Sequence, residues 1–419
     1  MKLFQKLLLA PAALGLFAPI AATASEANLM DVSSYSQVDV EVTQDTFKPL
    51  SSKNPLLAGG EGLGQDLSND FDGDSFSATT SASFNVNWVI GSVDGRSVNN
   101  AAVGQESTEN EEKIGNNYDW SLSTITSFTG NDSLDVTLSA GNGGAHLREM
   151  DLTGNASTTT SDGDVAVDSI SYTSTVGDYL TYAVGFGVDG SVLYNTACVY
   201  EGQTNTLSNC GFAASGLDMD FGTNAGLNID FDSIVEGLQL AIGYEGEGTN
   251  SDGLLTDEGA DSYGAQLSYI RDTFGVSLTA SHTENVADGT QNLVAGDNQT
   301  SDVRAINAFV IPQIDGFPSI SVGYEWREDN SVANDSQDEF TNYFIGFQFD
   351  ELGNGTLGAA VGSKEATRED LDAETMWEAY YAYNYADGIT ITPLVYYKEE
   401  NTGGVDDETG IILKTSFEF

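Results

Sequence analysis

Basic residues are scarce in this chain of 419 residues, which has 14 lysines and arginines against 64 aspartates and glutamates. The formal net charge is −50. A protein that binds nucleic acid needs a basic surface to neutralise phosphates, and this composition cannot supply one. Nucleic acid is therefore excluded as a partner.

Long hydrophobic runs are also missing, apart from one at the amino terminus. Lys2 and Lys6 precede an apolar run from Leu7 to Ile20, and the small residues Ala22–Ala24 follow it. A short basic segment, an apolar run and small residues in this order are typical of a cleavable secretory signal. The run is too short for a comfortable membrane span. We therefore predict a signal peptide over residues 1–24 and export of the rest.

Cysteine and histidine occur only twice each. Cys198 and Cys210 lie twelve residues apart in one polar segment, whereas His146 and His282 are far from them in sequence. Export places the cysteines in an oxidising compartment, where a local disulfide is expected. Two free thiols are the alternative. The separation of the histidines from the cysteines argues against a shared metal site.

Proline is rare, with 7 residues, whereas glycine is abundant at 46 and aromatic residues include 18 tyrosines and 20 phenylalanines. This composition favours many strands joined by flexible loops over helices. The acidic residues concentrate in segments rich in Gly, Asn, Ser and Thr that separate these strands. We interpret the acidic segments as surface loops rather than as disordered tails.

Alternation of apolar and polar residues recurs from Phe76 onward. In the first segment Phe84, Val86 and Trp88 share one face, and Asn85 and Asn87 share the other. A period of two is the pattern of a β-strand with one apolar face. We count about sixteen such segments, an even number as in most single-chain bacterial membrane barrels. They lie near 79–90, 118–128, 134–140, 165–176, 179–188, 217–231, 238–246, 261–270, 274–281, 302–311, 318–327, 340–350, 355–363, 374–385, 389–398 and 409–419.

Short and long connections alternate between these segments. Tight turns rich in Gly, Asn and Asp, such as 129–132 and 386–388, are followed by long polar connections, such as 144–164 and 189–216. Outer-membrane barrels have short periplasmic turns and long external loops. A soluble β-sandwich has no reason to keep this alternation. The fold class that we predict is all-β, a transmembrane antiparallel β-barrel over residues 76–419, preceded at 25–75 by a short polar periplasmic segment or partial plug.

The last strand supports the same interpretation. Ile411, Leu413, Phe417 and Phe419 lie on one face of the segment that ends the chain, with Lys414 on the other. A terminal strand with an aromatic last residue is typical of bacterial outer-membrane barrels. A half-buried strand of a soluble sandwich is the alternative for this segment taken alone.

Charged residues within the strands are expected to face inward. Lysine or arginine facing lipid near mid-membrane costs about 2–4 kcal/mol. Arg304 is placed inward because Val303, Ala305 and Phe309 look like the apolar row of its segment. The predicted pore-lining charged residues are Arg304, Arg327, Lys398, Lys414, Asp119, Asp135, Asp230, Glu325, Glu378 and Glu418.

A barrel of about sixteen strands is wide enough for an aqueous channel. Acidic loops at its mouth would concentrate cations, which predicts a weak cation preference. The expected partners are outer-membrane lipid, inorganic ions and small hydrophilic solutes, and a homotrimer is one assembly that the sequence permits. The alternative from another class is a non-conducting surface barrel, an adhesin or receptor that binds through its acidic loops.

Several short motifs resemble cyanobacterial outer-membrane porins, which are related to the carbohydrate-selective porin family. The residues that carry this resemblance are Met1–Gln5, Leu9–Gly15, the hairpin from Thr126–Leu134 to Leu138–Asn142, and the hairpin from Asp168–Tyr172 through Val176–Asp178 to Gly187. The resemblance implies a porin in the outer membrane, with sugars among its solutes.

The chain departs from that family in two ways. Such porins usually carry a surface-layer-homology domain and a coiled coil before the barrel, and residues 25–75 are too short for both. The strand Leu134–Leu138 also lacks the arginines that relatives often have there. Attachment to peptidoglycan and the relatives' pore selectivity are therefore not predicted for this chain.

Cofactor and metal sites are not predicted. Asp70–Asp74 has acids at the first, third and fifth positions of a calcium loop, but the sixth and twelfth positions are Ser75 and Ser81 instead of Gly and Glu. The glycine-rich Gly59–Gly64 follows no strand and opens no helix, so a nucleotide site is not supported.

Catalysis is not predicted either. Ser281 and His282 are the one adjacent serine and histidine pair in the chain. Neighbouring residues of a strand point to opposite faces, so this pair cannot act as nucleophile and base. We therefore expect a protein that is not an enzyme.

Overall fold

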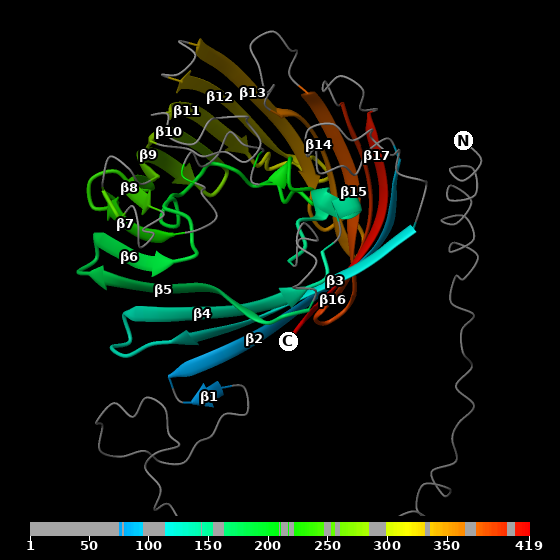
Figure 1. Cartoon of the computed structure of the whole chain (residues 1–419), viewed down its shortest axis with the longest axis horizontal. Coiled ribbons are helices and arrows are strands. Elements are labelled where there is room, and N and C mark those ends of the chain that lie inside the picture. Colours follow the sequence, from blue (N-terminus) through cyan, green and yellow to red (C-terminus); the bar gives the residue numbers. More distant parts are fainter. Residues whose placement is uncertain are drawn as a thin grey trace, which may run out of the picture. The chain divides into compact units, whose positions relative to one another are not determined.

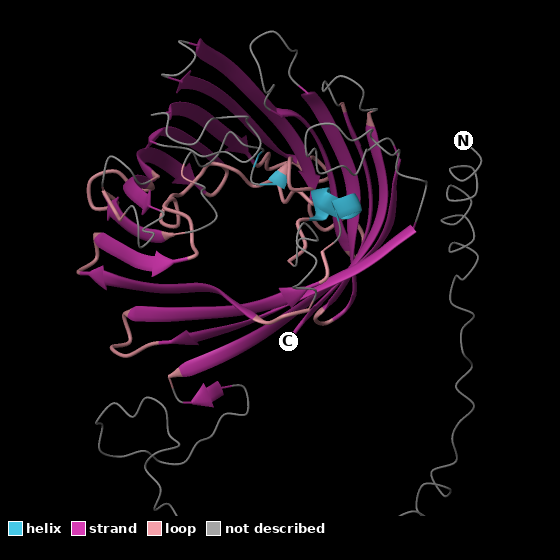
Figure 2. Ribbon diagram, in the orientation of Figure 1, coloured by secondary structure: helices cyan, strands magenta, loops and turns pink. Residues whose placement is uncertain are grey.

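A closed antiparallel β-barrel of sixteen strands, β2 to β17, forms most of the part of the chain that the structure, a computed structural model, describes (Figures 1 and 2). The described residues are 75–77, 79–94, 114–143, 145–153, 163–208, 210, 217, 222–246, 253–255, 260–284, 299–331, 336–364, 374–399 and 407–419. The predicted signal peptide, the segment before the barrel and the motifs Gly59–Gly64 and Asp70–Asp74 lie outside them, apart from Ser75.

The strands follow one another around the barrel in chain order. They are β2 (Thr80–Asp94), β3 (Ile114–Thr126), β4 (Asp132–Gly141), β5 (Ala166–Val176), β6 (Leu180–Phe186), β7 (Thr223–Asp230), β8 (Leu238–Gly246), β9 (Asp261–Arg271), β10 (Phe274–Glu284), β11 (Gln299–Val310), β12 (Ser319–Ser331), β13 (Ser336–Phe349), β14 (Gly355–Lys364), β15 (Glu374–Ala386), β16 (Ile389–Lys398) and β17 (Glu408–Glu418). A short strand β1 (Ser75–Ser77) pairs with the start of β2, and a 3₁₀ segment η3 (Ala145–Met150) follows β4.

The barrel closes between the last strand and the first long one. β17 pairs antiparallel with β2, with Lys414 opposite Val89. The backbone of Phe419 also exchanges hydrogen bonds with that of Phe84, at 2.7 and 3.1 Å, and the two rings lie 5.2 Å apart. The predicted strand count and the predicted role of the terminal strand are therefore confirmed. The segment near 217–231 forms a single strand, β7.

Alternation along the strands separates an apolar outer face from a polar inner face. On β10, Val276 and Leu278 are 38% and 50% exposed, whereas Ser277 and Thr279 are 0% and 4% exposed. Successive side chains of a strand point to opposite faces, so the exposed apolar row faces outward and the polar row faces the interior. This is the arrangement that the sequence pattern predicts. Among the described residues, no helix has the length and apolar character needed to cross a membrane.

The turn between β7 and β8 requires glycine at one position. Gly237 has a φ of +84°, and a Cβ there would clash with the carbonyl oxygen of Ile270 on β9. Gly130, in the turn between β3 and β4, has a similar φ of +85°, but a Cβ there would meet nothing within 4 Å. Both glycines therefore have the positive φ that favours glycine, but only Gly237 also lacks space for a side chain.

We expect Gly237→Ala to lower the free energy of unfolding by about 2–4 kcal/mol, because strain and a backbone clash add together. Gly130→Ala is the matched control and should cost about 1 kcal/mol, from the positive φ alone. Urea unfolding in lipid vesicles, followed by tryptophan fluorescence, measures both. Equal losses in the two variants would show that the contact with β9 does not matter.

Candidate functional site

The described residues 187–208 of the long connection between β6 and β7 lie inside the barrel, where Figure 1 shows their green trace crossing the ring. We call this part of the connection the interior segment. The sequence predicts only a long polar connection here, so its inward course is a finding of the structure. Residues from Gly190 to Tyr200 include no charged side chain. In so acidic a chain, that stretch is the one sequence signal that could have identified it.

Hydrogen bonds from the interior segment reach inward side chains of several strands in turn. Four amide donors spaced two residues apart contact β8, β10, β12 and β13. The pairs are Asn195 Nδ2 to Gln239 at 3.2 Å, Ala197 N to Ser277 at 3.0 Å, Val199 N to Ser321 at 3.0 Å and Glu201 N to Gln348 at 2.9 Å. The segment is extended, and the polar inner wall satisfies backbone groups that have no strand partner.

Glu378 on β15 holds the next turn of the interior segment. Its carboxylate accepts hydrogen bonds from the Tyr200 hydroxyl at 2.7 Å and from the backbone N–H groups of Gln203 and Thr204 at 3.1 and 3.0 Å. Glu378 is only 1% exposed. Burial, together with the negative charge of Glu378, raises the pKa of Tyr200, so its hydroxyl stays protonated and keeps donating.

A second carboxylate, that of Glu149 in η3, holds the same segment from the other side. Glu149 Oε1 lies 2.8 Å from Lys398 Nζ on β16, and both side chains are at most 5% exposed. Its Oε2 accepts a hydrogen bond from Thr206 N at 3.1 Å, and its backbone oxygen accepts one from Asn205 N at 2.8 Å. Two inter-strand connections and the barrel wall are therefore joined at one buried ion pair.

The predicted disulfide is present between Cys198 and Cys210, whose Cα atoms are 6.0 Å apart. The covalent loop that it closes contains Tyr200, Thr204 and Thr206. All three residues take part in the contacts with Glu378 or Glu149. The disulfide therefore limits the conformations of the part of the interior segment that is held most tightly.

The ten predicted pore-lining charges fall into three groups. Glu325, Glu378 and Lys398 face inward but are at most 4% exposed, so they support the wall and the interior segment instead of contacting open space. Six others also face inward but are less covered, so nine of the ten lie on the inward face of their strands. The six less covered inward residues are Asp119, Asp135, Asp230, Arg327, Lys414 and Glu418.

Arg304 is the exception, and its predicted inward orientation is wrong. It lies opposite Trp326 in the β11–β12 register, on the same face as Ile306. Trp326 and Ile306 are 49% and 38% exposed, whereas Ala305 and Phe309 are 4% and 8% exposed. The small residues of β11 allowed either face to be read as the apolar one, and burial of Phe309 inside the barrel decides between them.

The inner wall of β2–β5 is less covered than that of β8–β15. Val89, Val93 and Asn117, nearer the long connections, are buried, but a group of inward residues nearer the short turns keeps intermediate exposure. Ser277 and Asn307 on β10 and β11, by contrast, are both 0% exposed. The inward residues of intermediate exposure include Asn87, Asp119, Ser121, Ser123, Asp135 and Thr137. Lys414 on β17 interacts electrostatically with Asp119 and Glu418. The uncovered wall is therefore rich in hydroxyl, amide and carboxylate groups that suit hydrated solutes.

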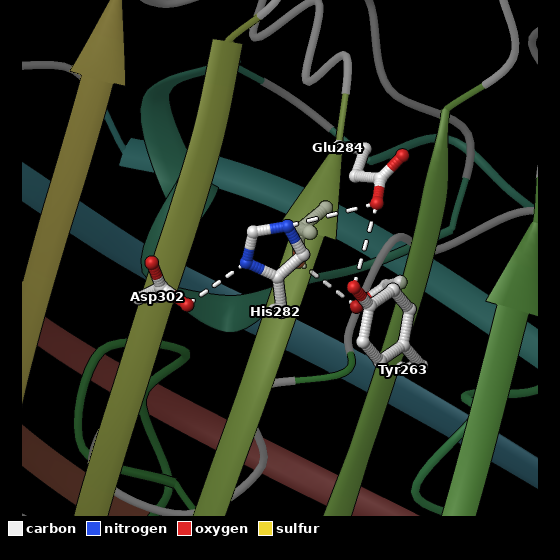
Figure 3. Close-up of polar contacts among 6 residues, drawn as sticks. Tyr263, His282, Glu284 and Asp302 are labelled. Atoms are coloured by element: carbon white, nitrogen blue, oxygen red, sulfur yellow. Dashed lines mark hydrogen bonds and ion pairs between the residues drawn. The ribbon is translucent and has the colours of Figure 1, made fainter. Parts of the chain in front are cut away.

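A polar cluster lies on the outer face, at the ends of β9, β10 and β11 (Figure 3). His282 Nδ1 is 2.8 Å from Asp302 Oδ1, and its Nε2 is 3.7 Å from Glu284 Oε1. The Tyr263 hydroxyl donates to Glu284 at 3.4 Å. Ser281 faces the interior and is 7% exposed, so the predicted separation of Ser281 from His282 is confirmed. Among the described residues, no cluster of three His, Cys, Asp or Glu side chains could hold a metal ion.

No family model and no curated protein matches the sequence. Solved outer-membrane barrels match the structure. The match to OprB of Pseudomonas putida covers 81% of this chain and 94% of OprB, at 10% identity and a TM-score of 0.57.

Two further barrels match at a TM-score of 0.50. The match to the trimer form of OmpT from Vibrio cholerae covers 81% of this chain and 100% of OmpT, at 11% identity. The match to OmpF of Salmonella typhi, solved with daunomycin, covers 81% of this chain and 98% of OmpF, at 14% identity. At these identities the likeness shows a shared fold, the closed barrel of outer-membrane proteins.

Lys398→Met should lower the free energy of unfolding by about 3–5 kcal/mol, because it leaves the Glu149 carboxylate buried without its cation. The double variant K398M/E149Q should recover much of this loss, since the remaining amide carries no charge. Urea unfolding of the wild type, both single variants and the double variant gives the coupling energy. A coupling energy near zero would contradict the role of this ion pair.

Glu378→Ala should release the turn at residues 200–204, because it removes the acceptor of three hydrogen bonds at once. We expect amide hydrogen exchange there to speed up by about tenfold or more, the effect of losing roughly one charge-assisted hydrogen bond. The exposed neighbour Glu201, changed to alanine, is the control and should exchange as the wild type does. Unchanged exchange in E378A would show that the disulfide alone holds this turn.

Proposed function

We propose that the protein is an outer-membrane porin that lets ions and small hydrophilic solutes diffuse passively through its barrel. One observation carries the proposal: a group of inward side chains on β2–β4 remains partly exposed, although it faces the centre of a closed barrel. Its members are Asn87, Asp119, Ser121, Ser123, Asp135 and Thr137. Opposite them, the interior segment covers the wall from β8 to β13. Diffusing solutes would pass between the interior segment and the uncovered wall.

The proposed selectivity is a weak preference for cations. Asp119 and Asp135 lie on the uncovered wall, and Lys414 is a cation that interacts with Asp119. The Glu149–Lys398 pair is buried and its charges compensate each other, so it adds little to the field along the passage. The net charge of −50 gives the whole molecule a negative field that attracts cations at low salt. Sugars are included among the proposed solutes because of the family resemblance.

The same proposal includes the cellular setting. Residues 1–24 would be removed on export, residues 25–75 would remain as a short periplasmic segment or partial plug, and the barrel would lie in the outer membrane. A homotrimer is proposed as its assembly. The match to OmpT in its trimer form and the family resemblance support this setting.

The second candidate is a non-conducting surface barrel that acts as an adhesin or receptor. The interior segment favours it, because hydrogen bonds, an ion pair and a disulfide fix that segment inside the barrel. A barrel whose interior is filled in this way could serve as a rigid platform for acidic loops. Conductance separates the two candidates directly.

Planar-bilayer recording of the purified protein tests the proposal. We expect stable single-channel steps and a reversal potential that indicates cation preference. The double variant D119N/D135N should lower the ratio of cation to anion permeability by roughly twofold, because it removes negative charge from the passage wall. Asp387, which is exposed in the turn between β15 and β16, provides the control D387N.

Absence of any conductance from correctly folded protein would reject the porin and favour the surface barrel. Clear anion preference would reject the proposed selectivity while leaving the porin in place. An equal change in D387N and in D119N/D135N would show that surface charge, and not the uncovered wall, sets the preference.

A further inference from the structure

A recess of about 400 Å³ lies between the interior segment and the inner wall, at the end of the barrel where the short turns join the strands. Val192–Tyr194 of the interior segment form one side of it, and the β5–β6 turn forms its edge with Asp178 and Tyr179. The wall residues come from β6, β7 and β8 and are Thr181, Asn228, Asp230 and Gln239. Pockets that bind small molecules usually have volumes of about 300–1,000 Å³, so the recess is large enough for a small solute.

Hydrogen bonds hold both sides of the recess in place. Asn228 Nδ2 donates to the backbone oxygen of Leu193 at 2.9 Å, and Asn195 Nδ2 donates to Gln239 Oε1 at 3.2 Å. At the edge, the backbone N–H of Asp230 donates to the backbone oxygen of Tyr179 at 2.9 Å. The interior segment, the wall and the turn are thus tied together around the space, which makes the recess preformed.

The charge of the recess is negative and is not balanced within its lining. Asp178 and Asp230 are carboxylates, and no lysine, arginine or histidine is among the described residues that line the recess. Asp230 accepts hydrogen bonds from Asp232 N at 2.7 Å and from Gln239 Nε2 at 3.2 Å, and both donors are neutral. The Asp178 side chain makes no hydrogen bond or ion pair with the residues that the structure describes.

The recess also offers more acceptors than donors, beside an apolar surface. An ionised carboxylate accepts about four hydrogen bonds and donates none, so Asp178 and Asp230 both have capacity left. Tyr179, 59% exposed at the edge, presents a ring that attracts cations. Leu180, Val192 and Leu193 contribute apolar surface. A matching ligand therefore has a positive charge, N–H donors and a short apolar part.

We propose that this recess binds a small organic cation, a primary ammonium group on a short apolar stem. The ammonium donates hydrogen bonds to the carboxylates of Asp178 and Asp230 next to the Tyr179 ring, and the stem lies against Val192 and Leu193. The proposal deepens the proposed function, because it names a class of cationic solute for the passage, and in that respect it rests on the porin.

Charge and hydrogen bonding together select this ligand class. An anion would be repelled by both carboxylates, and a neutral polyol would leave their charge unbalanced. A quaternary ammonium has the charge but no N–H group to donate. A hydrated inorganic cation has no apolar part to bury against Val192 and Leu193, so it gains less from the recess than an alkylammonium does.

Ligand-observed NMR of the full chain in detergent tests the proposal with n-butylammonium as the probe. Salt at about 0.15 M screens the diffuse attraction of the acidic surface. We expect saturable binding by the wild type and about tenfold weaker binding by Asp230→Asn, the effect of losing a charge-assisted hydrogen bond. Asp178 is exposed in its turn, so Asp178→Asn should weaken binding by about two- to threefold and is the variant to use if D230N does not fold.

Asp315→Asn is the matched control. Asp315 is exposed in the short turn between β11 and β12 and does not line the recess, so D315N removes the same charge and should bind as the wild type does. Equal weakening in D315N and D230N would overturn the site, as would wild-type binding in both D178N and D230N.

Three further probes separate the proposed ligand class from others. We expect n-butanol, n-butyrate and tetramethylammonium to bind at least tenfold more weakly than n-butylammonium, the effect of losing the charge-assisted hydrogen bonds. Equal binding of n-butanol would show an apolar cavity only. Equal binding of tetramethylammonium would show general attraction of cations without hydrogen bonds, and either result would overturn the proposal.

Planar-bilayer recording keeps this proposal apart from the porin. Binding of n-butylammonium is measured in detergent and does not depend on conductance. Conductance without selective binding would reject the recess as a cation site and leave the porin in place. Selective binding without conductance would reject the porin and leave a site for organic cations inside a closed barrel.

Discussion

Closure of the sheet is the constraint on which the rest of the structure depends. A strand inside a membrane has no water to satisfy its backbone groups, so each strand must have two neighbours. The pairing of β17 with β2 and the hydrogen bonds between Phe84 and Phe419 provide the last pair of neighbours. Once the sheet is closed, alternation along every strand divides the side chains into an outer apolar set and an inner polar set.

A closed barrel of sixteen strands encloses more space than its wall side chains can fill. Here the interior segment occupies part of that space, and its backbone groups find acceptors on the wall. The wall side chains Ser277, Ser321 and Gln348 accept these hydrogen bonds because the inner face is polar. The polarity of the inner face therefore anchors the interior segment, and it would also suit the hydrated passage that we propose.

Charges inside the barrel serve two physical purposes. Glu378, Glu149 and Lys398 are buried and satisfied by hydrogen bonds or by one another, so they position chain segments. Asp119 and Asp135 remain partly exposed, so in the proposed porin they would act on passing solutes. A charge on the inner face is therefore not by itself a pore-lining charge, because its exposure depends on what covers it.

The sequence by itself predicted the strands, their number as about sixteen, and their closure, because these follow from local alternation and turn residues. It also predicted the Cys198–Cys210 disulfide over two free thiols, from export and close spacing. Only the tertiary structure decided which connection enters the barrel, since its partners are remote: Tyr200 meets Glu378 across 178 residues. It also decided the face of Arg304. Small and apolar residues occur on both faces of β11, so periodicity is ambiguous there, and contact of Phe309 with the interior resolves it.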